Sequence, residues 1–179
     1  MIEVQQLAAG VLAGVLRGHS LDSELAAAWR AHAGIDERSR AAVQDIAYGV
    51  LRFLARIEAL LDALLDKPLA DARLRVLLLV ALHQLEHTRA APHAVVDHAV
   101  RTCQALGFTS AKGLVNAVLR NFLRRRAALV ARVQRAEPAR YCHPQWWIDK
   151  VRIQCPGEYA AILEAGNARP PLVLRVNCR

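Results

Sequence analysis

The stretch SAKGLVNAVLRNFLRRR, residues 110–126, combines an apolar stripe with a run of positive charge. At about 100° per residue, the apolar side chains fall on one side of a helix, in the i, i+3, i+4, i+7 spacing of a helix docked on a core. These side chains are Val115, Val118, Leu119 and Phe122. The pattern therefore predicts a core-facing helix with a solvent-facing side.

We expect this helix to have Ser110 as its N-cap and to continue to about Val133, because a serine hydroxyl accepts from a free first-turn N–H group. Its cations are the candidate residues for binding a polyanion such as a nucleic acid, namely Lys112, Arg120, Arg124, Arg125, Arg126 and Arg132. Arg126 falls near the apolar side, so its guanidinium must extend along the surface to reach water. A solvated amphipathic helix with a basic end is the simpler alternative.

The charge of the whole chain is concentrated around this helix. Residues 1–106 contain 11 Lys and Arg against 12 Asp and Glu, whereas residues 107–179 contain 13 against 4. The net charge of +8 therefore comes entirely from the C-terminal part. Such asymmetry indicates a polyanionic partner, and nucleic acid is favoured over an acidic membrane because the basic side lacks bulky apolar anchors.

The rest of the chain reads as helical. Apolar periodicity predicts helices over about 2–17, 20–32 and 36–52, continuing after a kink to 65, and over 71–87 and 92–106. Residues 74–85 are apolar almost all round, which is typical of a buried central helix. Gly49 lies inside a predicted helix, where glycine costs about 1 kcal/mol relative to Ala, so we expect it to allow a close helix contact. The predicted fold class is all-α.

The chain changes character at Glu137–Pro138. We expect residues 1–138 to form a helical RNA-binding or scaffold domain. Residues 139–179 would supply linker helices and the first strand, Leu172–Asn177, of a truncated α/β domain. An isolated strand is not stable by itself.

Three residue sets could carry chemistry. His83 and His87 match the H-x-x-E-H pattern of inverted zinc peptidases. His83 lies in the apolar part of its helix and no third ligand is evident, so we interpret both histidines as structural. Cys155 and Cys178 have no obvious paired base, so neither is a convincing nucleophile. The pair Trp146–Trp147 could stack on bases, but we expect it to pack in a core or domain junction.

Composition places the chain in a reducing compartment. Its four cysteines, Cys103, Cys142, Cys155 and Cys178, form no C-x-x-C pair, which favours free thiols in the cytoplasm. The start lacks a basic, signal-like region and no apolar run is long enough for a membrane span. Phosphate-binding glycine loops are absent, so we expect no nucleotide cofactor and no metal in this segment.

Several segments occur together in an order that is typical of one family. They are YGVLR (48–52), VLLLVALHQL (76–85), PHAVVDHAV (92–100) and KGLVNAVLR (112–120), followed by HPQW (143–146) and PPLVLRVN (170–177). The chain resembles the N-terminal region of the RsmB (Sun, Fmu) family of bacterial 16S rRNA cytosine-5 methyltransferases. It departs from the usual pattern at His83, where Tyr is common, and at Asp97, where Asn is common.

The resemblance implies a helical domain similar to the antitermination factor NusB, then a small RRM-like α/β RNA-binding domain, then a methyltransferase domain. That last domain binds S-adenosylmethionine and attacks C6 of cytosine with a cysteine thiolate. Its Pro-Cys and Cys-Ser motifs are absent here, so no catalytic residue is carried over. The implied partners are 16S rRNA and the protein's own C-terminal domain, with neither membrane nor DNA; the oligomeric state stays open.

Two rival functions remain. One is a NusB-type antitermination factor, which typically has an arginine-rich N-terminus, whereas Met1–Leu16 contains no Lys or Arg. Such factors also end near the close of the bundle, whereas this chain continues through HPQW (143–146) to PPLVLRVN (170–177). A purely structural docking domain is disfavoured by the excess positive charge beyond residue 106.

Overall fold

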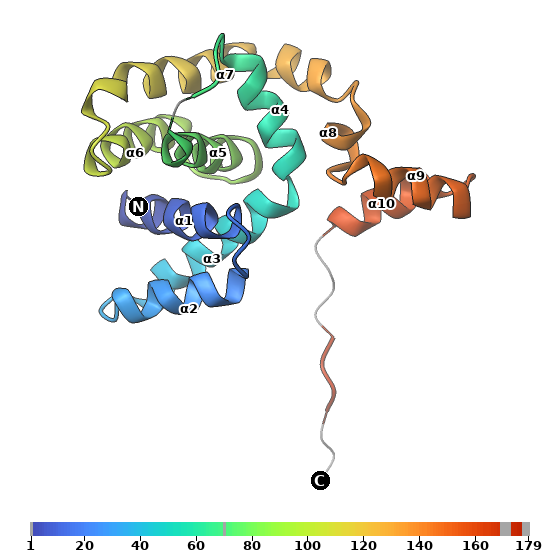
Figure 1. The fold of residues 1–179 in the computed structure, drawn as a ribbon, viewed down its shortest axis with the longest axis horizontal. Helices are drawn as coiled ribbons and strands as arrows, with labels where there is room; N and C mark the ends of the chain where they lie inside the picture. The colour runs from blue at the N-terminus through green and yellow to red at the C-terminus, as the bar shows by residue number, and fades with distance from the viewer. Residues whose placement is uncertain (1, 70, 169–172, 177–179) are drawn as a thin grey trace.

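The fold is organised around the helix α5, Ala72–His87. The structure is a computed structural model that describes residues 2–69, 71–168 and 173–176. This helix is buried along almost its whole length, from Leu74 to Leu85. It contacts α1, α3, α4, α6 and α7, which surround it (Figure 1). The predicted central helix and the all-helical NusB-like bundle are confirmed.

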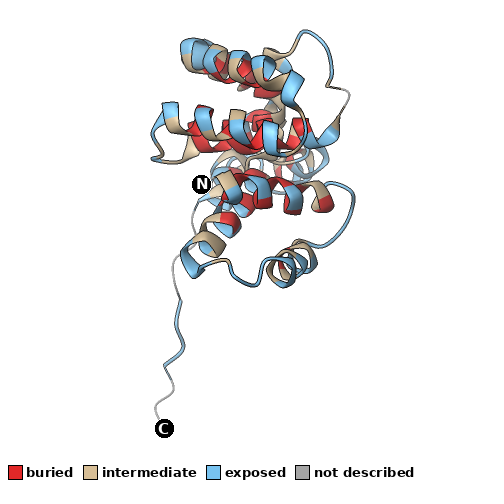
Figure 2. Ribbon diagram, turned by 90° about the vertical axis from the view of Figure 1, so that its left-hand side faces the viewer, coloured by how far each residue is buried: buried red, intermediate tan, exposed pale blue. Residues whose placement is uncertain are grey.

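The elements follow the order expected from apolar periodicity. They are α1 (Ile2–Val15), α2 (Leu21–Ala31), α3 (Glu37–Arg52), α4 (Leu54–Leu64), α5 (Ala72–His87), α6 (Pro92–Ala105), a short 3₁₀ turn (Thr109–Ala111), α7 (Lys112–Val133), α8 (Glu137–Tyr141), α9 (Gln145–Gln154) and α10 (Tyr159–Asn167). Figure 2 shows buried residues on the inward sides of the helices and exposed residues on their outer sides.

Local sequence signals set several helix ends. The Ser20 hydroxyl accepts from the backbone N–H of Ser23 at the start of α2, and Asp36 Oδ1 accepts from that of Ser39 at the start of α3. These side chains satisfy first-turn N–H groups that have no partner within the helix. Phe53 separates α3 from α4, which is the predicted kink.

One buried polar cluster ties the first helix to the centre of the bundle. Gln5 Nε2 donates to Gln84 Oε1 at 2.6 Å, and Gln5 Oε1 accepts from the Thr102 hydroxyl at 3.3 Å. All three residues are buried, so these bonds remove much of the cost of placing amides in an apolar core. They also fix how α1 sits against α5 and α6.

A second, smaller apolar cluster holds the C-terminal helices together. It consists of Tyr141, Ile148, Val151 and Leu163, from α8, α9 and α10. The bundle's own core ends at Ala139, only two residues before this cluster begins. The chain thus changes from one core to the other within α8.

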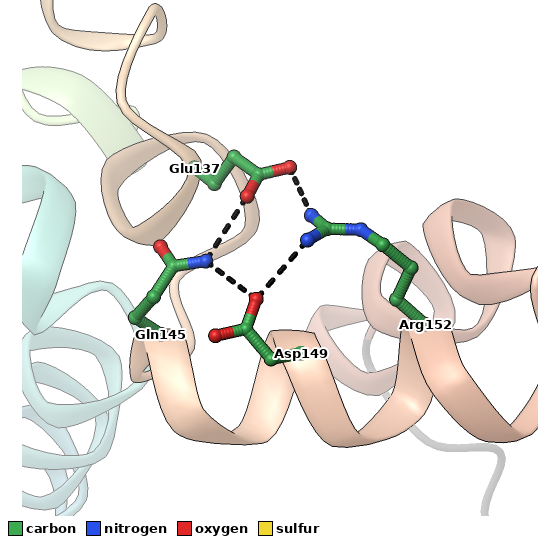
Figure 3. Close-up of polar contacts among 4 residues, drawn as sticks. All are labelled: Glu137, Gln145, Asp149 and Arg152. Carbon is green, nitrogen blue, oxygen red and sulfur yellow. Dashed lines mark hydrogen bonds and ion pairs between the residues drawn. The ribbon is translucent and has the colours of Figure 1, made fainter.

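Polar contacts join α8 to α9 on the surface (Figure 3). Gln145 Nε2 donates to Glu137 Oε2 at 3.1 Å and to Asp149 Oδ1 at 2.9 Å, and Arg152 pairs with both carboxylates. The hydrogen bonds from Arg152 and Gln145 lower the pKa of Glu137 below its usual value. A carboxylate held in this way stays charged and links the two helices at the surface.

Two sequence-based expectations were wrong in detail. Ser110 does not cap the basic helix; it lies in the 3₁₀ turn, and α7 begins after Ala111 without a side-chain cap. Residues 173–176, the described part of the predicted strand Leu172–Asn177, are exposed and form no strand, since no second strand lies beside them. Leu172 and Asn177, the two ends of the predicted strand, lie outside the described residues, as does Cys178. No helix in the described ranges is both long and apolar enough to cross a membrane.

Candidate nucleic-acid interface

Helix α7 presents the candidate cations because its other side is locked into the core. Val115, Val118, Leu119 and Phe122 are buried, as the spacing predicted. Leu129 and Val133 extend the same seam to the end of the helix. Its opposite side is exposed and lies on the outside of the bundle.

The first two cations, Lys112 and Arg120, line a groove between α6 and α7 with a volume of about 700 Å³. Arg120 is exposed and donates to Asn116 Oδ1 at 2.9 Å, one helical turn away. Asp97, on the facing helix, also lines the groove, but it pairs with Arg101 at 3.0 Å. The groove therefore retains the positive charge of Lys112 and Arg120.

Arg124 and Arg126 line a second depression, the arginine groove, which they share with Arg56 and Glu86. Arg126 Nη2 donates to the backbone carbonyl of Glu86 at 3.0 Å, so this guanidinium reaches across to the end of α5. Its side chain is exposed, as expected for a cation near the apolar side of the helix. Arg124 is also exposed and has no ion pair within the described chain.

The arginine groove contains a nearly buried ion pair. Arg56 Nη2 lies 2.7 Å from Glu86 Oε1, and the Glu86 side chain is only 4% exposed. Burial raises the pKa of Glu86, although the neighbouring guanidinium of Arg56 opposes the shift. The pair balances its own charge, so the net positive charge of this groove comes from α7. Arg56 lies on α4, 68 residues before Arg124, and nothing in its local sequence distinguished it.

The last two candidates lie elsewhere on the helix. Arg132 lies beside α4 in a shallow depression with Arg135 and Asp62, whose carboxylate binds Arg75 at 2.8 Å. Arg125 is exposed and lines none of these depressions. The six candidate residues thus surround the outer side of α7 instead of converging on one pocket.

The histidines of the H-x-x-E-H motif belong to an aromatic stack. The centroid of the His87 ring lies 4.0 Å from that of the Phe53 ring, with an 8° angle between the ring planes, and 5.3 Å from that of the His83 ring. Burial lowers the pKa of both histidines to about 4, so both rings are neutral at pH 7. Glu86, the motif's carboxylate, binds Arg56. Among the described residues, no three His, Cys, Asp or Glu side chains lie close enough to hold a metal ion.

The remaining candidates have ordinary surroundings. Trp146 is 66% exposed and Trp147 39% exposed, so the expectation that the pair packs in a core was wrong, whereas its place at a domain junction stays a prediction. Helix α9 instead buries Ile148 and Val151, which lie on its other side. Cys155 is the C-cap residue of α9 and is half-buried.

These features define a helical bundle of one buried helix and its surrounding layer, with a basic helix on the outside and a short helical extension. The chain belongs to the NusB family, whose match spans residues 3–124. Residues 143–179 match the ferredoxin-like domain of the RsmF/B-like methyltransferases.

The relatives confirm the resemblance to the RsmB family that the motifs indicated. "Ribosomal RNA small subunit methyltransferase B" of Pseudomonas putida is 42% identical over 175 residues, 96% of this chain and 39% of that protein. The protein of the same name from Vibrio vulnificus is 39% identical over 180 residues, 98% of this chain and 41% of that protein. The chain thus spans about two fifths of the length of the curated relatives it matches.

Proposed function

We propose that this segment is the RNA-recognition and scaffolding part of a ribosomal RNA small-subunit methyltransferase that modifies a cytosine at C5. The observation that carries the proposal is the identity to such methyltransferases along nearly the whole chain. The exposed cations of α7 support it, because Lys and Arg contacts to phosphates supply most of the affinity of RNA-binding proteins.

The contacts of these cations are with phosphates and position the RNA without reading its sequence. Lys112 and Arg120 hold one part of the backbone, and Arg124 with Arg126 holds another. Arg125 and Arg132 extend the basic surface around the helix. We assign residues 1–138 to this RNA-binding scaffold and residues 139–179 to the start of a second RNA-binding domain.

Catalysis belongs outside this segment. The described residues form helices, with no strand, loop and helix that could bind S-adenosylmethionine, and the family's two cysteine motifs are absent from the sequence. The cofactor and the methyl transfer are therefore assigned to a further domain of the whole protein, for which this segment is also a docking partner. The proposed location is the cytoplasm, where rRNA is modified.

A NusB-type antitermination factor is the alternative that the family match keeps open. The match of residues 143–179 to a methyltransferase-associated domain favours the methyltransferase.

Photochemical crosslinking of the chain to 16S rRNA tests the proposal. We expect crosslinked peptides from α7, and we expect unlabelled 16S rRNA to compete for them better than duplex DNA of equal length. Crosslinks confined to other helices, or equal competition by duplex DNA, would contradict the assignment.

A further inference from the structure

A pocket of about 510 Å³ lies between α3 and the C-terminal half of α5, away from the grooves of α7. Its volume falls within the range of small-molecule sites. Aromatic rings and polar groups share its lining: Tyr48, Phe53, His83 and His87 supply rings, and Gln44, Asp45 and Arg52 supply polar groups.

The stacked rings of Phe53, His83 and His87 form an uncharged part of the lining, the aromatic wall. Phe53 and His87 stack almost in parallel at 4.0 Å, and the His83 ring is inclined to that of His87 by 27°. Tyr48, one helical turn before Arg52, also lines the pocket and is 46% exposed. Both histidines are neutral at pH 7, so their rings add no positive charge to the lining.

The wall also contains unused hydrogen-bonding capacity. Nδ1 of His83 and Nε2 of His87 are buried and form no hydrogen bond within the described chain, although His87 Nε2 lies 3.7 Å from Glu86 Oε2. His83 itself is only 4% exposed. Buried polar atoms are normally paired, so an unpartnered nitrogen in a pocket wall indicates a site that is completed by a ligand or by water.

The pocket adjoins the arginine groove through the last turn of α5. His87 and Thr88 line the pocket, and the preceding residue, Glu86, lines the groove. Glu86 binds Arg56 through its carboxylate and Arg126 through its backbone carbonyl. Both guanidinium groups are close enough to contribute to the lowered pKa of His87. An aromatic pocket and a phosphate-binding groove thus lie on either side of one helix end.

We propose that this pocket binds one unpaired base of an RNA strand whose phosphates lie along Arg124 and Arg126. The inference rests on the proposed RNA-binding function and adds to it that the bound RNA is single-stranded at this point. Proteins recognise unpaired RNA by placing splayed bases on aromatic side chains and by hydrogen bonds to base edges. Gln44 and Asp45 offer both donors and acceptors for such an edge.

Substitution of Tyr48 separates stacking from charge. Tyr48→Ala removes the half-exposed ring, whereas Tyr48→Phe keeps the ring and is the matched control. The probe is a 12-nucleotide oligoadenylate RNA, with the matched RNA duplex in parallel, and affinity is measured by fluorescence anisotropy at several salt concentrations.

We expect Tyr48→Ala to weaken oligoadenylate binding about tenfold to hundredfold, the effect of losing one stacked base. The slope of log affinity against log salt should stay unchanged, because no phosphate contact is lost. Tyr48→Phe should bind within about twofold of the unmodified chain, and duplex affinity should not change in either variant. A 2-aminopurine placed in the strand should be quenched on binding, and Phe53→Leu should reduce that quenching.

Failure of this inference differs from failure of the proposed function. If the unmodified chain binds RNA with a steep salt dependence but Tyr48→Ala binds equally well, the pocket takes no base while the function stands. Equal losses for single-stranded and duplex RNA would also overturn the pocket. If the unmodified chain binds no RNA, both proposals fail. Thermal melts identify any variant that does not fold, and Tyr48→Ala should melt like the unmodified chain because Tyr48 is half-exposed.

Discussion

The close contact at Gly49 makes a sharp prediction for the packing of α3 on α5. A Cβ atom at this position would lie 2.3 Å from Nε2 and 2.4 Å from Cε1 of the His83 ring. Real Cβ contacts are essentially never shorter than 3.0 Å, so Gly49→Ala must displace the ring. That ring cannot move freely, because His83 is buried and lies in the stack with Phe53 and His87.

Two opposing effects decide the size of the change. Forcing extra atoms into a packed core costs about 1–3 kcal/mol. Replacing a mid-helix glycine by alanine gains about 1 kcal/mol of helix propensity. We therefore expect Gly49→Ala to lower the free energy of unfolding by about 1 kcal/mol. In a His83→Ala background the obstruction is gone, so the same substitution should raise stability by up to about 1 kcal/mol.

Urea denaturation of the four proteins of this double-mutant cycle measures both effects. Gly10→Ala is the matched control, since Gly10 is exposed in the middle of α1 and a Cβ atom there would meet nothing within 4 Å. It should stabilise by about 0.5–1 kcal/mol in either background. If Gly49→Ala stabilises as much as Gly10→Ala, or acts equally with and without the His83 ring, the close contact is absent.

Three further predictions concern the histidines and the cofactor. Because burial lowers the pKa of His83 and His87 to about 4 from an unfolded value of about 6.5, the unfolded state binds more protons between these values. The free energy of unfolding should fall as the pH falls from 6.5 toward 4, and above pH 6.5 this pair should change it little. In urea titrations, His87→Phe should reduce the loss of stability between pH 6.5 and 4. An unchanged pH dependence in this variant would contradict the buried stack. Elemental analysis of protein purified without chelator should find no stoichiometric zinc; one equivalent of zinc that His83→Ala removes would revive the zinc-peptidase interpretation. Calorimetry should detect no binding of S-adenosylmethionine to this chain, and saturable binding would overturn the assignment of the cofactor to another domain.

Much of the bundle could be predicted because its signals are local. The apolar residues 74–85 indicated the buried helix, and Val115–Phe122 marked the seam of α7. The caps at Ser20 and Asp36 followed from side-chain chemistry alone. A glycine within a helix likewise indicated a close approach, although the sequence did not say that its neighbour would be a histidine ring.

The errors arose where tertiary context outweighs local preference. Ser110 has the right chemistry for an N-cap, but the chain enters α7 through a 3₁₀ turn that leaves its side chain out of the capping position. The pair Trp146–Trp147 was assigned to a core by size, whereas α9 buries its other side. The predicted strand needed a partner strand, which the described residues do not provide.

The site was harder to predict because its parts come together only in space. The arginine groove joins Arg56, Glu86 and Arg126 from three helices, through one ion pair and one bond to a backbone carbonyl. No spacing rule connects residues 30 and 40 positions apart. The aromatic pocket has the same origin, since Tyr48 and Phe53 meet His83 and His87 only where α3 packs against α5.

The most direct test of RNA binding by α7 is a filter-binding salt titration with a 16S rRNA fragment. Arg120, Arg124 and Arg125 are exposed, and their joint change to Gln removes three potential phosphate contacts. The control changes Arg17, Arg30 and Arg38 to Gln, which removes equal charge from exposed positions in the N-terminal part. Thermal melts of all three proteins should agree closely, because exposed charges typically change stability by less than about 0.5 kcal/mol.

Each lost phosphate contact flattens the slope of log affinity against log salt by about 0.7–0.9. The α7 triple variant should therefore bind more weakly, with a slope flatter by about two to three units, while the control keeps the slope of the unmodified chain. If the titrations of the α7 variant and the unmodified chain superimpose while both proteins melt alike, this face does not bind RNA.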